Sequence, residues 1–225
     1  KIGSSAFPAS SMTKIFIPKS VTTINAGSVT NSPFRACSPS LVIYCEAESA
    51  PSGWGQYWNY YADGKPLTVK YGQTMASTYN MLDKSKFSTS TTSHGVKFTN
   101  NGDGTIVCNR TESSTSVATM TVSTVNIITG HIYVLRGCPA GGGYNAGLYA
   151  LYGLTAYFPG RLVDEGNGAI SNSNTTTTTP LQIRVGSSVN CSNLTFVPEL
   201  YDLTAIFGAG NEPATIAEFE EIFGK

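Results

Sequence analysis

Charged residues are scarce in this sequence. Only 12% of its 225 residues are charged, and 14 Lys and Arg balance 14 Asp and Glu, so that the formal net charge is zero. Proteins that bind nucleic acid or anionic membrane surfaces concentrate positive charge on one face. The composition therefore gives no electrostatic case for either partner, and we expect no nucleic acid to be bound.

Long apolar runs and a leader sequence are also missing. No run approaches the roughly 20 apolar residues of a membrane-spanning helix, so we expect no membrane insertion. No secretory signal opens the chain. The sequence begins inside a patterned segment, Lys1 to Phe7, which suggests a fragment of a longer protein.

The five cysteines do not form a metal-binding or disulfide pattern. They are odd in number, far apart and without a C-x-x-C pair, at Cys37, Cys45, Cys108, Cys138 and Cys191. Neither a zinc site nor a complete disulfide framework is indicated. We expect buried or half-buried free thiols, with at most one or two bridged pairs, and neither a metal nor a cofactor.

Recognisable catalytic motifs are absent as well. His94 and His131 have no nucleophile motif such as G-x-S-x-G around them. A glycosidase needs two facing carboxylates roughly 5 to 10 Å apart. The acids here lie mainly in expected turns, at Asp103, Asp164 and Glu165, or in the expected C-terminal helix. We therefore expect a protein that is not an enzyme.

The sequence is rich in small hydroxylated and aromatic residues, with 25 Ser, 27 Thr, 23 Gly and 12 Tyr. This composition fits pleated strands and turn-rich loops better than helices. We expect a mainly β chain with a first domain at residues 1–72, a linker at 73–78 and a second domain at 79–225.

Residues 1–48 contain a weak internal repeat. The segment IGSSAF (Ile2 to Phe7) precedes Met12 to Ile24, and a looser copy runs from Ser32 to Ala47. Alternating apolar residues predict one short strand per copy, at Ile15 and Ile17 and again at Val42 and Tyr44. One strand and one turn per unit is typical of a solenoid, in which each unit buries its apolar side against the next.

These residues resemble the irregular leucine-rich repeats of bacterial surface proteins, the BspA-like group. The resemblance rests on IGSSAF, on IFIPKSV (Ile15 to Val21) and on the F-x-x-C of Phe34 to Cys37. The segment from Asn25 to Pro33 is longer than the pattern, and Met12 replaces its usual Leu. Roughly two units are present, so the resemblance implies the C-terminal end of a longer array.

Residues 49–72 carry a cluster of aromatic side chains and lead to an expected last strand at Leu67 to Tyr71. We hold two interpretations open. The rings cover the open end of the solenoid, or they form a platform on which sugar rings stack. The residues concerned are Trp54, Tyr57, Trp58, Tyr60 and Tyr61.

The clearest hairpin lies in the second domain. Val96 and Phe98 alternate with polar residues, so that both face a core. NNGDG (Asn100 to Gly104) forms the turn, and Ile106 and Cys108 face the core from the returning strand. The turn could also suggest a calcium loop, but it lacks the further carboxylates and the Glu of an EF-hand. A plain turn is favoured. We expect Ser171 to Thr179 to form an exposed low-complexity loop.

The residues that begin and end helices are most clearly recognisable near the C-terminus. Asp202 is a good N-cap for a short helix that Gly208 ends, and Thr215 with Glu218 forms a capping box for a second helix. So short a helix is unstable alone in water. We therefore expect a helical clasp that closes the β domain, docking through one apolar face made of Ile216, Phe219, Ile222 and Phe223.

Residues 79–223 resemble a domain common in tail-associated and minor structural proteins of phages and prophages that infect gut Firmicutes. The matching segments are Gly95 to Ile106, Tyr133 to Gly137 and Phe196 to Glu220, which ends in DLTxxFGxGNEPxTxxEFE. The resemblance implies an antiparallel, jelly-roll-like β-sandwich similar to carbohydrate-binding modules. It also implies display outside the cell, on a virion or on a bacterial surface.

The two resemblances and the neutral, aromatic composition predict an adhesion or receptor-binding module for a surface polysaccharide or another host-cell surface component. The alternative is a purely structural spacer of a tail fibre or surface stalk, which could form a homo-oligomer through its parent protein. Alternation places Tyr149 and Tyr152 on opposite faces of one strand. Candidate ligand-binding residues are Trp54, Trp58, Tyr144, Tyr149, Tyr152, Tyr157, Arg161 and Asp164.

Overall fold

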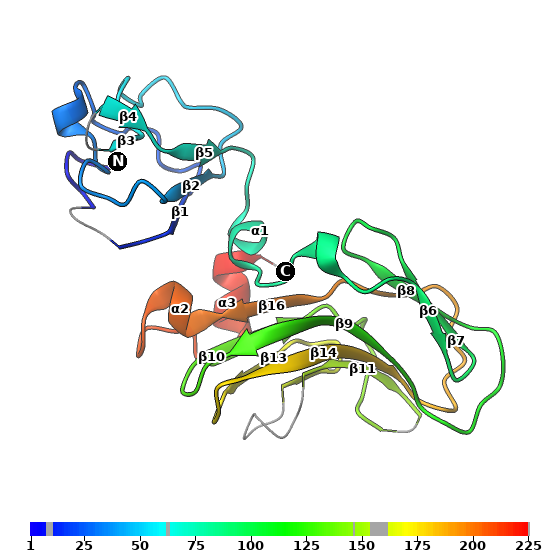
Figure 1. Ribbon diagram of the computed structural model, residues 1–225. Coiled ribbons are helices and arrows are strands. Elements are labelled where there is room, and N and C mark those ends of the chain that lie inside the picture. The colour runs from blue at the N-terminus through cyan, green and yellow to red at the C-terminus, as the bar shows by residue number, and fades with distance from the viewer. Residues whose placement is uncertain (8–10, 62–63, 146, 154–161, 225) are drawn as a thin grey trace. The chain divides into compact units, whose positions relative to one another are not determined.

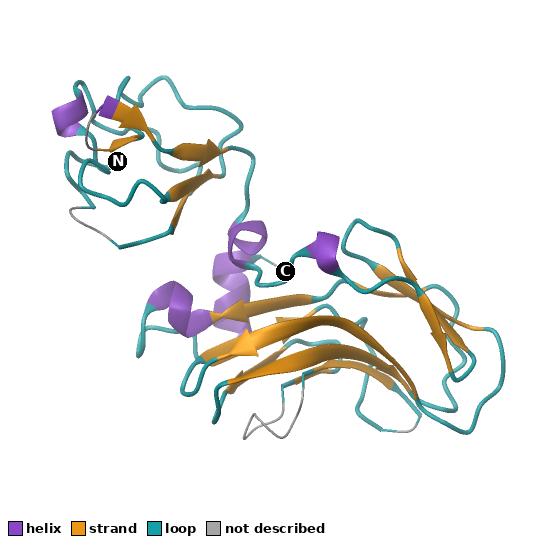
Figure 2. Ribbon diagram, in the orientation of Figure 1, coloured by secondary structure: helices purple, strands orange, loops and turns teal. Residues whose placement is uncertain are grey.

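The computed structural model describes residues 1–7, 11–61, 64–145, 147–153 and 162–224. The chain divides into two compact units, Lys1–Thr78 and Tyr79–Lys225. In both, the regular structure is mainly β-strand, joined by loops and accompanied by a few short helices (Figure 2). The mainly β prediction is therefore confirmed, and each unit is described by itself.

The first unit is built on parallel pairing. Strands β1 (Lys14–Ile17), β2 (Val42–Cys45) and β5 (Thr68–Lys70) form a parallel sheet in that order. A second row of parallel bridges joins Ile2 to Ile24 and Ile24 to Trp54. Each repeat of the chain thus adds one strand to the sheet and one residue to the row of bridges. The remaining short elements are η1 (Val29–Asn31), β3 (Tyr60–Tyr61) and β4 (Lys65–Pro66).

The segment expected to be a linker contains a helix, α1 (Met75–Tyr79). Its start is fixed by a reciprocal pair of hydrogen bonds. The Ser77 amide donates to Thr74 Oγ1, and the Thr74 amide donates to Ser77 Oγ, both at 3.0 Å. Satisfying two amides that the first turn leaves unpaired stabilises this short helix.

The described residues of the second unit form eleven strands in three antiparallel sheets (Figure 1). The sheet orders are β15-β8-β7-β6, β12-β11-β14-β9 and β13-β10-β16. A short η3 (Lys84–Lys86) precedes them. The strands are β6 (Thr91–Ser93), β7 (Val96–Asn100), β8 (Ile106–Arg110), β9 (Ala118–Ile127), β10 (Ile132–Arg136), β11 (Tyr149–Tyr152), β12 (Val163–Asp164), β13 (Ala169–Asn172), β14 (Thr177–Val185), β15 (Leu194–Phe196) and β16 (Glu199–Asp202).

The predicted hairpin is confirmed as β7 and β8, with Phe98 opposite Cys108. Its turn is held by local bonds, since Asp103 Oδ1 accepts from the Thr105 amide at 2.8 Å and from Thr105 Oγ1 at 2.6 Å. Both strands alternate buried and partly exposed residues. The buried side chains join one core with those of β9, β11 and β14, so the sheets pack as layers around it.

The expectation of an exposed loop at Ser171 to Thr179 is wrong at both ends, and only residues 173–176 lie outside the strands. Ala169–Asn172 forms β13 and Thr177–Val185 forms β14, whose threonines pair with β9. Threonine is β-branched and favours pleated strands. Here that preference, together with nine residues of pairing partners on β9, outweighs the low complexity of the run.

Thr179 gives a stability prediction, because its side chain is 1% exposed. Its Oγ1 has no hydrogen-bond partner among the described residues. A buried hydroxyl without a partner costs free energy. Replacing Thr179 with valine, which keeps the shape, is expected to raise the free energy of unfolding by about 1 kcal/mol.

Urea unfolding measures this effect, and Thr178→Val is the matched control. The exposed Thr178 hydroxyl donates to Asn126 Oδ1 at 2.6 Å, so its loss brings no gain. Equal changes in the two variants would contradict the account of Thr179.

The C-terminal clasp consists of α2 (Leu203–Phe207) and α3 (Ile216–Phe223). Its predicted N-caps are confirmed: Asp202 accepts from the Ala205 amide, and Thr215 accepts from the Glu218 amide. The second bond of the capping box differs from the prediction, because the Glu218 carboxylate accepts from the Ala214 amide. Figure 1 shows α2 and α3 beside β16. The apolar face is narrower than expected, because Ile222 is 44% exposed whereas Phe219 and Phe223 are buried.

Candidate functional site

The best candidate for a binding site is the outer face of the sheet β12-β11-β14-β9. Tyr152, Gln182 and Thr121 lie in register on β11, β14 and β9. The Tyr152 hydroxyl donates to Gln182 Oε1 at 2.8 Å, and Gln182 Nε2 donates to Thr121 Oγ1 at 3.2 Å. Burial raises the pKa of Tyr152. The phenol is therefore protonated at neutral pH, as this donor role requires.

Tyr144 and Arg184 lie next to this row. The Arg184 guanidinium carbon is 4.7 Å from the centre of the Tyr144 ring, and Tyr144 meets Tyr152 edge-on with 5.2 Å between ring centres. Arg184 Nη1 also donates to the Asn145 carbonyl at 2.6 Å. We call Tyr144, Tyr152, Gln182, Arg184 and Thr121 the tyrosine–arginine face.

The side chains of this face are unequally accessible. Tyr152 is 9% exposed, whereas Tyr144 and Arg184 are partly exposed. The Tyr144 amide donates to Glu165 Oε1 at 2.7 Å, which fixes the backbone that carries the ring. Tyr144 is therefore the more accessible ring for a ligand, and the buried Tyr152 ring packs against it.

Tyr149 lies on the opposite face of β11, as alternation predicted. Its ring packs against the core, edge-to-face with Phe196 at 6.1 Å between centres. Its hydroxyl donates to the Ala140 carbonyl at 2.7 Å. Tyr149 and Tyr152 therefore do not share a binding surface.

Asp164 is a structural carboxylate in this fold. It is 1% exposed. Its Oδ2 accepts from the Cys138 amide at 2.7 Å, and its Oδ1 accepts from the amides of Gly166 and Gly168, each at 2.8 Å. All of these partners are backbone groups of adjoining loops. Tyr157 and Arg161, the other two candidates of this region, lie outside the described residues.

Trp54 and Trp58 are packed into the first unit. They are 7% and 6% exposed and meet edge-on with 4.5 Å between ring centres. Trp54 Nε1 donates to the Val21 carbonyl at 2.9 Å. A stacking platform needs an accessible ring face, which these burial values do not provide. A polar hollow of about 450 Å³ adjoins Trp54 and includes Ser4, Asn25 and Ser52 in its lining.

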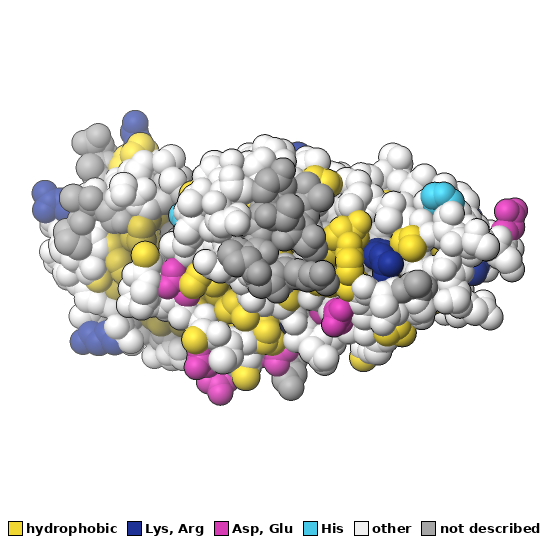
Figure 3. Space-filling view, turned by 90° about the horizontal axis from the view of Figure 1, so that it is seen from below, with side chains coloured by type: hydrophobic (Ala, Val, Ile, Leu, Met, Phe, Trp, Pro, Cys, Tyr) yellow, Lys and Arg dark blue, Asp and Glu magenta, His cyan; other side chains and the backbone are white. Residues whose placement is uncertain are grey.

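The chain carries few charged groups on the side seen in Figure 3. Uncharged atoms cover most of this view, with scattered apolar, acidic and basic side chains. Where the described residues are uncharged, such a surface suits neutral ligands, because it has no charge that a ligand would have to desolvate.

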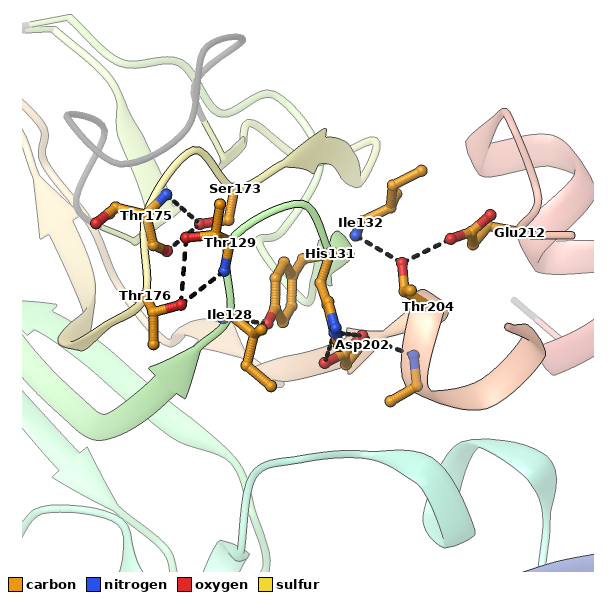
Figure 4. Close-up of polar contacts among 12 residues, drawn as sticks. Ile128, Thr129, His131, Ile132, Ser173, Thr175, Thr176, Asp202, Thr204 and Glu212 are labelled. Carbon is orange, nitrogen blue, oxygen red and sulfur yellow. Dashed lines mark hydrogen bonds and ion pairs between the residues drawn. The ribbon is translucent and has the colours of Figure 1, made fainter. Parts of the chain in front are cut away.

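A His–Asp pair lies where the clasp meets β10 (Figure 4). His131 Nδ1 is 2.8 Å from Asp202 Oδ2, and Asp202 Oδ1 also caps α2. Thr204 Oγ1 accepts from the Ile132 amide and donates to Glu212 Oε1 at 2.6 Å. The pair and the threonine thus join the turn before β10 to α2 and to the turn that connects α2 with α3. Among the described residues, no Ser or Cys side chain hydrogen-bonds His131.

The described part of the chain contains neither a metal-binding cluster nor an activated cysteine. It contains no group of three or more His, Cys, Asp and Glu that could hold a metal ion. The five cysteines are buried thiols, as expected, and none of them forms a disulfide bond. Burial raises the pKa of Cys45 and of Cys138 to about 12, which keeps both as unreactive thiols. No helix within the described ranges is long and apolar enough to cross a membrane.

Gln182, Arg184 and Thr121 are residues of the candidate site that sequence reasoning missed. Strand alternation puts Gln182 and Arg184, two residues apart in LQIRV (Leu181 to Val185), on one face of their strand. Nothing local showed that β14 pairs with both β11 and β9, which is what brings them to Tyr152. Comparison with known proteins adds no further residue: no family model matches the chain, and no curated protein or solved structure shows significant similarity to it.

Proposed function

We propose that this chain is a non-enzymatic adhesion or receptor-binding module that recognises neutral surface saccharides through the tyrosine–arginine face. The observation that carries the proposal is the half-buried Tyr144 ring, held between Tyr152 and Arg184 beside the Gln182 and Thr121 side chains. Saccharides combine apolar ring faces with neutral hydroxyls. An aromatic ring next to an amide and a hydroxyl complements both.

The finer architecture and setting belong to the same proposal. The two parallel rows of the first unit support a leucine-rich-repeat-like solenoid closed by Trp54 and Trp58. The antiparallel layers of the second unit support a jelly-roll-like domain. The setting we propose is a phage tail or a bacterial cell surface, where such domains display binding faces.

The test is a screen of the whole 225-residue chain on an array of host and bacterial glycans, followed by titration of each hit. Tyr144→Ala is expected to weaken binding about three- to tenfold, because aromatic contacts contribute roughly 0.5–1.5 kcal/mol. Tyr44→Ala is the matched control, since Lys70 Nζ lies 5.3 Å from the centre of that ring in the other unit. Equal affinities of the Tyr144 variant and the unaltered chain would remove this face as the site.

The structural alternative is favoured by one observation. Trp54, Trp58, Tyr152 and Asp164 are buried and already engaged by the protein itself. A spacer would bind no glycan on the array and would form a defined oligomer in sedimentation experiments. A reproducible glycan hit on the second unit contradicts it.

A further inference from the structure

A second polar cavity lies in the second unit, between two loops. One wall is the segment 110–114, which leads from β8 toward β9, and the other is the segment 187–190 between β14 and β15. The cavity has a volume of about 440 Å³, within the range of roughly 300–1,000 Å³ of small-molecule sites. Its lining is Arg110, Thr111, Glu112, Ser113, Ser114, Ser187, Ser188 and Asn190. We call it the hydroxyl pocket.

Arg110 holds the two walls together. Its Nε donates to the Val189 carbonyl at 2.5 Å, on the far wall, and its Nη2 donates to the Gly186 carbonyl at 2.8 Å, just before that wall. Its Nη1 donates to the His94 carbonyl at 3.1 Å. One guanidinium thereby cross-links three loops through their backbone. Walls fixed in this way lose little conformational entropy when a ligand binds.

The near wall is also fixed against the turn between β6 and β7. The amides of Thr111 and Glu112 donate to the Gly95 carbonyl at 2.8 and 3.2 Å. Gly95 has a φ of +74°, and a Cβ at this position would lie 2.2 Å from the Glu112 carbonyl oxygen. Only glycine allows so close an approach, so the pocket wall depends on the residue type of a neighbouring turn.

The lining chemistry favours a neutral, hydroxylated ligand. The side chains of Ser113, Ser187 and Asn190 make no hydrogen bond to any other described residue, so their donors and acceptors are available. The guanidinium of Arg110 donates its N–H groups to backbone carbonyls, those of Val189, Gly186 and His94, and the acidic Glu112 also lines the pocket. A free anion therefore gains little here, whereas a polyol meets groups that both donate and accept.

We propose that the hydroxyl pocket binds a neutral mono- or disaccharide through side-chain hydrogen bonds. None of its lining residues belongs to the tyrosine–arginine face. It recognises its ligand without an aromatic ring from the described part of the chain, because none of the described residues that line it is aromatic. The site is therefore independent of the proposed function, and either can be right without the other.

The test is an amide-resolved NMR titration of the whole chain with glucose, galactose, mannose, N-acetylglucosamine and N-acetylgalactosamine, each at millimolar concentrations. At least one sugar is expected to shift the amides of residues 110–114 and 186–190. Ser187→Tyr fills the pocket and is expected to weaken this binding at least about tenfold. Ser113→Tyr blocks it from the facing wall, which covers the case that the first variant folds poorly.

Ser192→Tyr is the matched control, because this exposed serine lies on the same loop as Ser187 but outside the lining. It is expected to bind as the unaltered chain does. Glucuronate and inorganic phosphate serve as charged probes, and stronger binding of either would overturn the assignment to neutral ligands.

The position of the shifts separates the two proposals. Shifts confined to residues 144, 152, 182 and 184 would overturn the hydroxyl pocket and support the tyrosine–arginine face. Shifts confined to the pocket would do the reverse. The absence of shifts at 110–114 and 186–190 with every sugar would overturn the pocket whatever happens elsewhere.

Discussion

Replacing Phe219 with alanine is expected to lower the free energy of unfolding of the second unit by about 3–5 kcal/mol. The side chain is 0% exposed. Its ring stacks on Phe223 with 4.3 Å between centres and lies 5.0 Å from Tyr201 on β16. Removing it opens a cavity at the point where the clasp docks on the sheet.

A charge adds to this effect. The Arg136 guanidinium carbon lies 5.2 Å from the centre of the Phe219 ring and 5.6 Å from that of Tyr201. It also pairs with Glu199, and both side chains are largely buried. Loss of the Phe219 ring therefore removes a cation–π contact from Arg136, whose ion pair with Glu199 is mostly desolvated.

Urea unfolding with near-UV circular dichroism measures the change. Ile222→Ala is the matched control, because Ile222 lies on the same helix and is 44% exposed. It is expected to stay within about 0.5 kcal/mol of the unaltered chain. Similar losses in both variants would show that α3 is not anchored through Phe219.

Asp164→Ala is the second substitution with a large expected effect, a loss of about 3 kcal/mol or more. The variant leaves three backbone amides without their acceptor, those of Cys138, Gly166 and Gly168. Hydrogen bonds to an ionised group are stronger than neutral ones. Burial also prevents water from replacing the lost carboxylate easily.

Thermal and urea unfolding of Asp164→Ala and Asp164→Asn test this role. The asparagine variant keeps one acceptor oxygen and is expected to lose less stability than the alanine variant. Asp103→Ala is the control, since that carboxylate serves only its own exposed turn. If Asp164→Ala leaves stability unchanged but abolishes glycan binding, Asp164 is a ligand contact and the structural account is wrong.

Features determined by neighbouring residues could be predicted from the sequence. The caps at Asp202 and Thr215 and the hairpin around Asp103 depend on groups a few residues apart, which the sequence displays directly. The exposure of Ile222 could not be predicted in this way. It lies at the edge of the apolar stripe, and the position of the sheet beneath decides which edge is covered.

Features that depend on long-range pairing were missed. The threonine run at 177–179 joins a strand because β9 supplies partners some fifty residues earlier in the chain. The same pairing creates the tyrosine–arginine face from β11, β14 and β9. Arg110 gives no local sign of its role, since its carbonyl partners at Gly186 and Val189 are more than seventy residues away.

The way Arg110 holds its loops has a consequence for molecular engineering. Because the guanidinium grips main-chain carbonyls, the frame of the pocket does not depend on which side chains the walls carry. Positions 113, 187 and 190 can therefore be randomised together while the scaffold stays intact. One arginine and one glycine would then support a library of recognition surfaces, much as a fixed framework carries variable loops in antibodies.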